Sequence, residues 1–125
     1  MQPTEQPTHR VLVCGARDYS DSGFLQFILD YLYASTQFTT LIQGGATGAD
    51  ALAKEWADAN GVSCVSFPAQ WRVNGKLDRS AGPKRNQRVI DEGKSDLVVA
   101  FPGGKGTADM VRRARKAHIS VAEVE

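Results

Sequence analysis

The sequence has little of what marks several common classes of protein. Its two cysteines, Cys14 and Cys64, belong to no cluster with zinc spacing, and no apolar run approaches the ~20 residues that cross a bilayer. No signal-peptide pattern follows Met1. Fifteen Lys and Arg residues oppose fourteen Asp and Glu residues, which leaves no global field to hold a nucleic acid. We therefore expect a cytoplasmic protein with reduced, buried cysteines and without a metal, cofactor, membrane or nucleic-acid partner.

The length of the chain suits one hydrophobic core. With 125 residues, of which 42% are hydrophobic, it can bury roughly two-thirds of its unfolded surface without a disulfide or metal. Residues 1–8 are polar and contain two prolines, which predicts a disordered tail. Residues 9–125 contain no linker, and we expect them to form one domain.

Short apolar runs alternate with helical patterns from residue 9 onward. The runs predict five buried parallel strands, at residues 9–15, 39–43, 62–67, 96–101 and 119–124. Helices are predicted at 23–35, 49–60, 83–92 (with Pro83 as the first helical residue) and 106–118. This order predicts an α/β fold: a single Rossmann-like domain with a mostly parallel five-stranded sheet and helices on both faces.

The helical patterns also predict which side chains face the core. In helix 23–35 the apolar stripe consists of Phe24, Phe27, Ile28, Tyr31 and Leu32. In helix 106–118 the expected buried residues are Ala108, Val111 and Ala114. More aromatic surface is present than one small core needs, which is compatible with a second subunit; it comes from Phe24, Phe27, Tyr31, Tyr33 and Trp56.

Three turns after predicted strands carry unusual chemistry. They read CGARDY at 14–19, QGGATGAD at 43–50 and FPGGKGTAD at 101–109. In a parallel sheet such turns meet beyond the carboxyl ends of the strands, where ligands bind. Glycine lets a ligand approach backbone N–H groups, and helix N-termini attract phosphate, so we predict a phosphate or ribose site. Tight turns of this kind also need glycine without any ligand.

Several polar residues of these turns have two interpretations. Thr47 and Thr107 can cap their helices or donate a hydroxyl to a phosphate, whose charge Lys105 can balance. Asp50 and Asp109 can stabilise helix dipoles or accept ribose hydroxyls. Neither of the two later turns matches the G-x-G-x-x-G dinucleotide fingerprint, and no P-loop is present.

The segment between the third strand and Pro83 is a loop of roughly fifteen residues, long enough to suggest a function. Trp71 can stack on a base with Arg72 beside it, or simply pack the loop onto the domain. A basic cluster follows at the start of the next helix, and it is either a solvated face or a phosphate-facing helix end. Its members are Lys84, Arg85 and Arg88.

With these motifs in hand, the chain resembles the SLOG superfamily, and within it the YspA/cpYpsA-related branch. The resemblance covers residues 10–122 and rests on five motifs in order: GARDY at 15–19, GGATGAD at 44–50, FPAQW at 67–71, AGPKRNQ at 81–87 and FPGGKGTADM at 101–110. More distant members are the lonely-guy phosphoribohydrolases and the DNA-processing protein Smf/DprA. The resemblance implies a ligand such as a nucleoside monophosphate, a nucleotide sugar or an ADP-ribose-like signal, and it also implies a homo-oligomer.

The same resemblance bears on catalysis. The phosphoribohydrolases carry PGG-x-GT-x-x-E, and the position of its glutamate is Met110 here, which can neither polarise ribose hydroxyls nor stabilise an oxocarbenium ion. Asp109 lies one residue earlier and points about 100° away on a helix. If the chain is an enzyme, its catalytic residues are expected to be Arg85 and Asp109, with Asp50 or Asp18 as alternative carboxylates.

Three functions stay open from the sequence. The first is a sensor or sequestering protein for a nucleotide-derived small molecule; the alternatives are a nucleotide N-glycosidase and a DprA-type DNA-binding module, which the near-neutral charge disfavours. The predicted ligand-binding residues are Gly15, Arg17, Asp18, Gly44, Gly45, Thr47, Gly48, Asp50, Trp71, Arg85, Asn86, Pro102, Gly103, Gly104, Lys105, Gly106 and Thr107. Of the two later turns, 102–107 is the better phosphate site, and 44–50 is expected to hold the rest of the ligand through Asp50.

Overall fold

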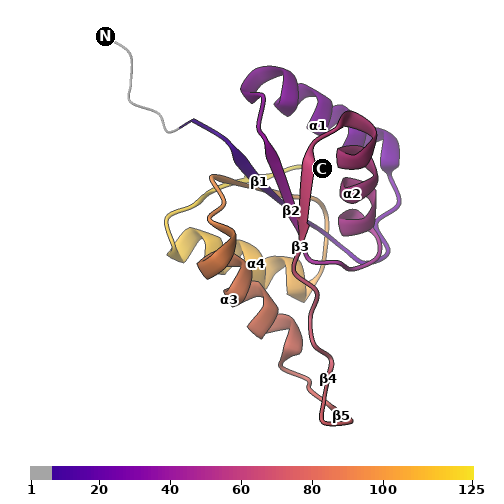
Figure 1. Ribbon diagram of the computed structural model, residues 1–125, viewed down its shortest axis with the longest axis vertical. Helices are drawn as coiled ribbons and strands as arrows, with labels where there is room; N and C mark the ends of the chain where they lie inside the picture. The colour runs from indigo at the N-terminus through magenta and orange to yellow at the C-terminus, as the bar shows by residue number, and fades with distance from the viewer. Residues whose placement is uncertain (1–6) are drawn as a thin grey trace.

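A parallel five-stranded sheet with helices on both faces forms the body of the protein (Figure 1). The computed structural model describes residues 7–125, so most of the predicted tail, residues 1–6, lies outside the described residues. The strands are β1 (Arg10–Cys14), β2 (Thr40–Gln43), β3 (Ser63–Ser66), β4 (Arg72–Val73), β5 (Lys76–Leu77), β6 (Leu97–Ala100) and β7 (Ser120–Glu123). The helices are α1 (Ser22–Thr36), α2 (Ala49–Asn60), α3 (Ala81–Gly93) and α4 (Lys105–Lys116).

The strand order of the main sheet is β3-β2-β1-β6-β7, with every neighbouring pair parallel. All five predicted strands are present, each slightly shorter than its apolar run. The chain builds outward from β1 to β3 and then returns to the other side of β1 to add β6 and β7. The order therefore reverses between β1 and β6, and such a reversal opens a crevice at the carboxyl ends of the two strands.

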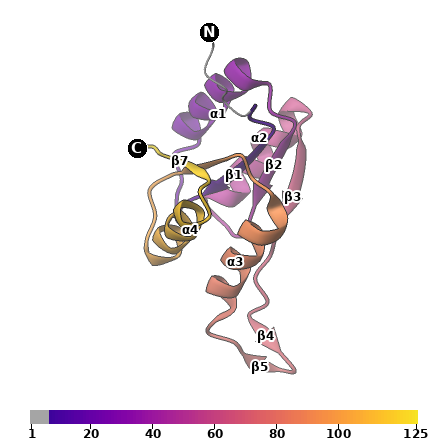
Figure 2. The ribbon, with the colours of Figure 1, turned by 90° about the vertical axis from the view of Figure 1, so that its left-hand side faces the viewer.

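Two hydrophobic cores lie on opposite faces of the sheet. Helices α1 and α2 cover one face, and α3 and α4 cover the other (Figure 2). The first core contains Leu25, Phe38 and Trp56, and the second contains Ile42, Val89 and Met110. Alternate residues of the central strands face these two cores, which is why the strands read as continuous apolar runs.

The buried stripe of α1 differs from the predicted one. Leu25 and Leu29 are fully buried, whereas Phe27 is 64% exposed and Tyr31 is 69% exposed. Phe24, Ile28 and Leu32 pack against the first core as predicted, so the stripe is wrong only at Phe27 and Tyr31. More than half of the residues of this helix are apolar, and several stripes therefore satisfy the same spacing.

The start of α3 also differs. The helix begins at Ala81, so Pro83 is its third residue and not its first. Proline is tolerated there because the first four N–H groups of a helix have no intrahelical acceptor, and a proline at the third position removes none that was needed.

The predicted loop after β3 contains a β-hairpin, β4–β5, that projects from the body (Figures 1 and 2). Its turn residues, Asn74 and Gly75, have φ of 53° and 77°, as a two-residue hairpin turn requires. At its base the Asp78 N–H donates to the Trp71 carbonyl at 2.6 Å. The hydroxyl of Ser80 and the Lys84 ammonium lower the pKa of Asp78 to about 2. The hairpin is thus short but well anchored.

The two cysteines are both free. Cys14 is buried, as predicted, but Cys64 is only partly buried because β3 is an edge strand of the sheet. None of the helices within residues 7–125 has the length and apolar character needed to cross a membrane.

Candidate functional site

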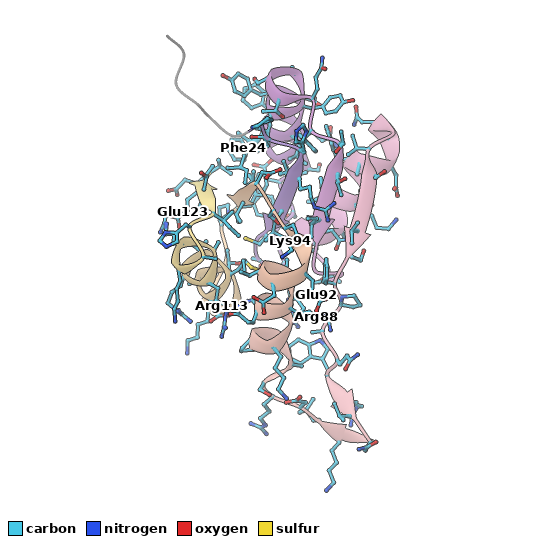
Figure 3. All side chains as sticks on the ribbon, turned by 60° about the vertical axis from the view of Figure 1, so that its left-hand side comes forward. Phe24, Arg88, Glu92, Lys94, Arg113 and Glu123 are labelled. Carbon is cyan, nitrogen blue, oxygen red and sulfur yellow. The ribbon has the colours of Figure 1, made fainter. Side chains whose placement is uncertain are left out.

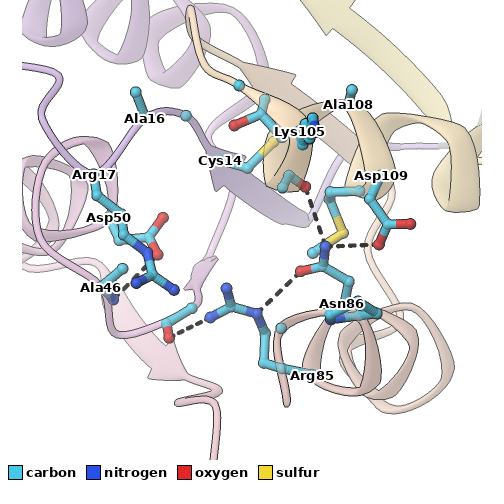
Figure 4. Close-up of a pocket in the computed structure, with 18 of the residues that line it drawn as sticks. Cys14, Ala16, Arg17, Ala46, Asp50, Arg85, Asn86, Lys105, Ala108 and Asp109 are labelled. Carbon is cyan, nitrogen blue, oxygen red and sulfur yellow. Dashed lines mark hydrogen bonds between the residues drawn. The ribbon is translucent and has the colours of Figure 1, made fainter. Parts of the chain in front are cut away.

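A cleft of about 830 Å³ lies at the carboxyl ends of β1 and β6, where the strand order reverses. Its walls are the β1–α1, β2–α2 and β6–α4 turns and the start of α3, as Figure 4 shows. The volume is near the upper end of the range for small-molecule sites. The predicted convergence of three glycine-containing turns is therefore present in the fold.

Eleven of the seventeen predicted ligand-binding residues line this cleft: Gly15, Arg17, Gly44, Asp50, Trp71, Arg85, Asn86, Gly104, Lys105, Gly106 and Thr107. The other six do not line it: Asp18, Gly45, Thr47, Gly48, Pro102 and Gly103. Pro102 and Gly103 face a smaller depression of about 210 Å³ beside the end of β7.

The β6–α4 turn presents an open helix N-terminus. Gly104 is the N-cap residue of α4, and no side chain caps the helix, so Thr107 is not a capping residue. A Cβ at Gly104 or Gly106 would meet no atom within 4 Å, which leaves their backbone accessible. The first N–H groups of such a helix have no intrahelical acceptor and suit an anion.

Glycines of the β2–α2 turn make room for other parts of the protein. A Cβ on Gly44 would collide with the guanidinium of Arg85. Gly48 has φ of 71°, and a Cβ there would overlap the carbonyl of Arg17. The Thr47 hydroxyl donates to the same Arg17 carbonyl at 2.9 Å and therefore caps no helix. Close internal packing, which the sequence alone could not separate from ligand approach, explains these two glycines.

Asp50 is a buried carboxylate in the cleft wall, 7% exposed. The Ala46 N–H donates to its Oδ2 at 3.2 Å, but no cationic nitrogen within residues 7–125 lies within 4.0 Å of it. Burial raises the pKa of Asp50, and the N–H groups of Ala46 and Gly44 together with the more distant charges of Arg85 and Arg17 only partly oppose that shift. Because Asp50 lines the cleft, a ligand bound there could donate a further hydrogen bond to this carboxylate.

Arg85 ties two turns together from the start of α3. Its Nη1 donates to the Gly44 carbonyl at 2.6 Å and to the Phe67 carbonyl at 3.4 Å, and its Nε donates to Oδ1 of Asn86 at 3.0 Å. Burial lowers the pKa of Arg85, and no carboxylate of the described chain lies within 4.0 Å of it. The side chain combines a structural role with an unpaired positive charge at the cleft (Figure 4).

Asp109 is occupied by its neighbours. Asn86 donates to its Oδ2 at 3.0 Å, Arg113 donates to the same oxygen at 2.8 Å, and Arg112 pairs with its Oδ1. Burial alone would raise its pKa, but the hydrogen bonds from Arg113 and Asn86 outweigh that effect and lower the pKa of Asp109. The Asn86 amide also donates to the Gly106 carbonyl at 3.2 Å, so this network fixes the α4 turn against α3.

Met110 and Cys14 make part of the cleft wall apolar. Met110 is 4% exposed and lines the cleft, so the position that holds a glutamate in the phosphoribohydrolases faces this site with a thioether. Burial and the nearby Asp50 raise the pKa of the Cys14 thiol to about 12. At neutral pH this thiol is therefore not a nucleophile.

At the mouth of the cleft, Arg17 from the β1–α1 turn meets Trp71 from the loop before β4. The guanidinium carbon of Arg17 lies 4.7 Å from the centroid of the Trp71 ring. The predicted partner, Arg72, instead reaches the carbonyl of Gly75 in the hairpin. Only tertiary structure brings Arg17 and Trp71 together, because 53 other residues separate them in the sequence.

The predicted basic cluster divides in the structure. Lys84 pairs with Asp78 at 2.9 Å, on the hairpin side. Arg88, labelled on α3 in Figure 3, lies over the ring of Phe67 and donates to the Pro68 carbonyl at 3.0 Å. Of the cluster, only Arg85 lines the cleft.

The charges that line the cleft are unevenly paired. Within the described chain, no carboxylate lies within 4.0 Å of Arg17, Arg85 or Lys105. Asp109 is paired, which leaves Asp50 as the acidic side chain without a cation. The site therefore carries an excess of unpaired positive charge and suits an anionic ligand that also has a hydrogen-bond donor. Among residues 7–125 no cluster of three metal-ligating side chains is found.

Sequence reasoning missed several residues of the cleft: Cys14, Ala16, Ala46, Gly82, Pro83, Ala108, Met110 and Arg112. Most lie directly beside predicted site residues, and the turns could have been extended by one or two positions. Ala108 was expected in the core but is exposed in the first turn of α4, where the cleft replaces a packing partner.

Comparison with known proteins supports one family. The model of the YspA, cpYpsA-related SLOG family matches residues 9–73, from β1 to β4. The chain is also 34% identical to the Gene 61 protein of Mycobacterium phage D29 over 120 residues, which covers 90% of this chain and 93% of that protein. The family match includes the first two turns of the cleft.

Two solved structures resemble the fold. The Moco carrier protein from Chlamydomonas reinhardtii superposes with a TM-score of 0.67 and 19% identity, over 94% of this chain and 76% of its own. MurG from Acinetobacter baumannii superposes with a TM-score of 0.58 and 18% identity, over 94% of this chain but only 34% of its own. At these identities the two structures bear on the fold alone. The sequence matches show more: the chain belongs to the YspA, cpYpsA-related SLOG family.

Proposed function

We propose that the protein binds a nucleotide or nucleotide-derived small molecule in this cleft and acts as a sensor or sequestering protein. One observation carries the proposal: an uncapped helix N-terminus and unpaired cations share a cleft with a buried carboxylate that has no cation within 4.0 Å. The helix N-terminus and the cations suit a phosphate, and the buried carboxylate suits a ribose hydroxyl that donates a hydrogen bond to it. Both groups occur together in nucleotides.

The phosphate end is assigned to the start of α4. Gly104 and Gly106 leave the backbone open, and Lys105 is free to balance a negative charge. The N-terminus of α2 is a poorer candidate because the Ala49 N–H already donates to the Ala16 carbonyl at 3.2 Å. The two turns therefore have unequal roles.

The hydroxyl end is assigned to Asp50. A buried carboxylate without a cation is costly, and a ligand hydroxyl that donates to it would recover part of that cost. The same charge repels a phosphate, so the ligand has one preferred direction in the cleft. The Moco carrier protein, which shares the fold, is by its name also a carrier of a small molecule.

The positions at which a catalytic carboxylate was expected favour binding without turnover, because most of them offer no free carboxylate to the cleft. Met110 brings no charge to the position of the phosphoribohydrolase glutamate, and Asp109 is held by Arg112 and Arg113. Asp18 does not line the cleft.

An N-glycosidase is the second candidate, because the pKa of Asp50 is raised and its side chain lines the cleft. In that reaction Asp50 would take a proton from water as the water oxygen bonds to C1′. The base would leave with the electrons of the C1′–N bond and gain a proton from solvent. Release of free base, absent in Asp50→Asn, would support this candidate over binding alone.

Calorimetry and thermal shift with nucleoside monophosphates, ADP-ribose and a nucleotide sugar test the proposal. We expect at least one to bind, with affinity that falls in Lys105→Ala and in added salt, but not in the control Lys84→Ala. Mass spectrometry of what the denatured protein releases would identify a copurified ligand. If no compound of this class binds the wild-type protein, the proposal is wrong.

A homo-oligomer is also proposed. Its support is the exposed aromatic pair Phe27 and Tyr31 on α1, which leaves an apolar surface that a second subunit could cover. Light scattering should give a mass above 13.5 kDa that decreases when both residues are replaced by serine. A monomer at micromolar concentration would contradict this.

A further inference from the structure

Arg17 and Trp71 form a contact at the mouth of the cleft. Because both side chains are exposed, core packing does not explain why they lie there. Both side chains are exposed, Trp71 to 39%, and both line the cleft. They come from opposite walls, one from the β1–α1 turn and the other from the loop before the hairpin. A cation over an aromatic ring at an exposed site is a weak contact, and it is easily exchanged.

The backbones that hold this pair are fixed, so only the side chains are free to move. The Arg17 carbonyl accepts the Thr47 hydroxyl at 2.9 Å and packs against Gly48, and the neighbouring Ala16 N–H donates to the Pro102 carbonyl at 2.9 Å. On the other wall, the Trp71 carbonyl accepts the Asp78 N–H at 2.6 Å. The Trp71 ring lies against the start of α3, where a Cβ on Gly82 would be 3.5 Å from its Cη2 atom, so we take the longer Arg17 side chain to be the one that rotates.

The distance between the two groups decides how a ring can bind here. Two flat groups in contact lie about 3.5 Å apart, so a ring held between the guanidinium and the indole would need about 7 Å. The guanidinium carbon is only 4.7 Å from the Trp71 centroid. A ligand ring cannot enter between them and must replace Arg17 on the indole face.

We propose that Trp71 is the platform for a planar heteroaromatic ring of the ligand, and that Arg17 covers this platform until the ligand replaces it. This inference rests on the proposed function and adds the class of ring and the group that gates it. The displaced guanidinium is released beside the cleft, where it is free to pair with the ligand's phosphate. Arg17 therefore lowers the affinity for a ligand that has a ring but no phosphate, and it raises the affinity for a ligand that has both.

The first test needs no ligand and follows tryptophan fluorescence. Trp56 is 4% exposed, so the emission lost in Trp71→Phe isolates the signal of Trp71. We expect Arg17→Ala to increase the quenching of this signal by acrylamide, because the guanidinium no longer covers the ring. Arg72→Ala is the matched control and should leave it unchanged. Equal quenching in wild type and Arg17→Ala would contradict the claim that Arg17 covers the Trp71 ring in the ligand-free protein.

The second test compares the tightest-binding nucleoside monophosphate of an AMP, GMP, CMP and UMP panel with its own nucleoside. Loss of a weak cation–π contact should let Arg17→Ala bind the nucleoside about two- to fivefold more tightly than wild type does. The same variant should bind the monophosphate more weakly than wild type does. Trp71→Ala should weaken both ligands, whereas Trp71→Phe should keep a platform and retain most of the affinity.

The outcomes separate this inference from the proposed function. If a monophosphate binds but Trp71→Ala has no effect, or if Arg17→Ala weakens nucleoside and monophosphate equally, the gated platform is wrong and the binding site stands. If the wild-type protein binds none of the four monophosphates, ADP-ribose or the nucleotide sugar at millimolar concentration, both the platform and the proposed function are overturned.

Discussion

Replacement of Asp50 by asparagine should stabilise the protein while it weakens ligand binding. The carboxylate is 7% exposed, and no cation of the described chain lies within 4.0 Å, so folding removes it from water without an ion pair. Asparagine has the same shape and keeps an oxygen for the Ala46 N–H. Removal of a poorly compensated buried charge should add about 1 kcal/mol to the free energy of unfolding. For a chain of this length that corresponds to a rise in Tm of about 4 °C.

The pH dependence gives this prediction a sign. The pKa of Asp50 is raised in the folded protein, so between the unfolded value of about 3.9 and the folded value the native state binds more protons. Wild-type stability contributed by this group therefore falls as pH rises through that window and stays low above it. The advantage of Asp50→Asn should therefore grow as pH rises through the folded pKa and should disappear below about pH 4.

Urea denaturation from pH 3 to pH 8, with calorimetry on the ligand that binds best, measures both effects. We expect the variant to be more stable at pH 7 and to bind about three- to tenfold more weakly, because the ligand hydroxyl then donates to a neutral amide oxygen, which costs about 1 kcal/mol of binding free energy. A variant that is less stable than wild type at pH 7 would refute the reasoning, since the carboxylate would then be well compensated in the fold.

Two further predictions concern the framework of the cleft. Asp109→Asn should lower the free energy of unfolding by roughly 1 kcal/mol at pH 7, because the pKa of Asp109 is lowered in the fold and its ion pair with Arg113 is lost. This loss should vanish as pH falls through the lowered pKa. A difference in urea midpoint that does not depend on pH would contradict the prediction. Gly48→Ala should lower the free energy of unfolding by about 2 kcal/mol, since Gly48 has φ of 71° and a Cβ would overlap the Arg17 carbonyl. The control Gly61→Ala, at φ of 68° with no atom within 4 Å of the new Cβ, should lower it by less. Equal losses in the two variants would show that the overlap at Gly48 relaxes freely.

Much of the fold could be predicted from the sequence because the three central strands, β1, β2 and β6, are almost entirely buried. Their apolar runs end at turns, whereas the edge strands β3 and β7 are only partly buried and begin and end with polar residues. The β4–β5 hairpin was missed because each of its strands has two exposed residues and no periodicity to detect. Two of the five predicted stripe positions of α1, Phe27 and Tyr31, were misplaced because these residues are as apolar as those that the core uses.

The candidate site could be located from its glycine-rich turns, but the state of its charges could not. Asp50 and Asp109 both follow a Gly-rich turn with an alanine before them, and the sequence treats them almost alike, although Asp50 is the second residue of α2 and Asp109 the fifth of α4. The structure separates them through partners on other elements: Asp109 is paired, and Asp50 is not. The contact between Arg17 and Trp71 is of the same kind, since it depends on two loops that meet only in the folded chain.

The projecting hairpin has a practical consequence for measurement. Its tip, Asn74–Gly75, is exposed, and a Cβ at Gly75 would meet no atom within 4 Å, so an inserted sequence would disturb little there. The base of the same hairpin begins beside Trp71, at the mouth of the cleft. A short peptide tag that binds a fluorophore, inserted at the tip, would serve as an optical reporter near the site. The protein could in this way be converted into a biosensor for its own ligand.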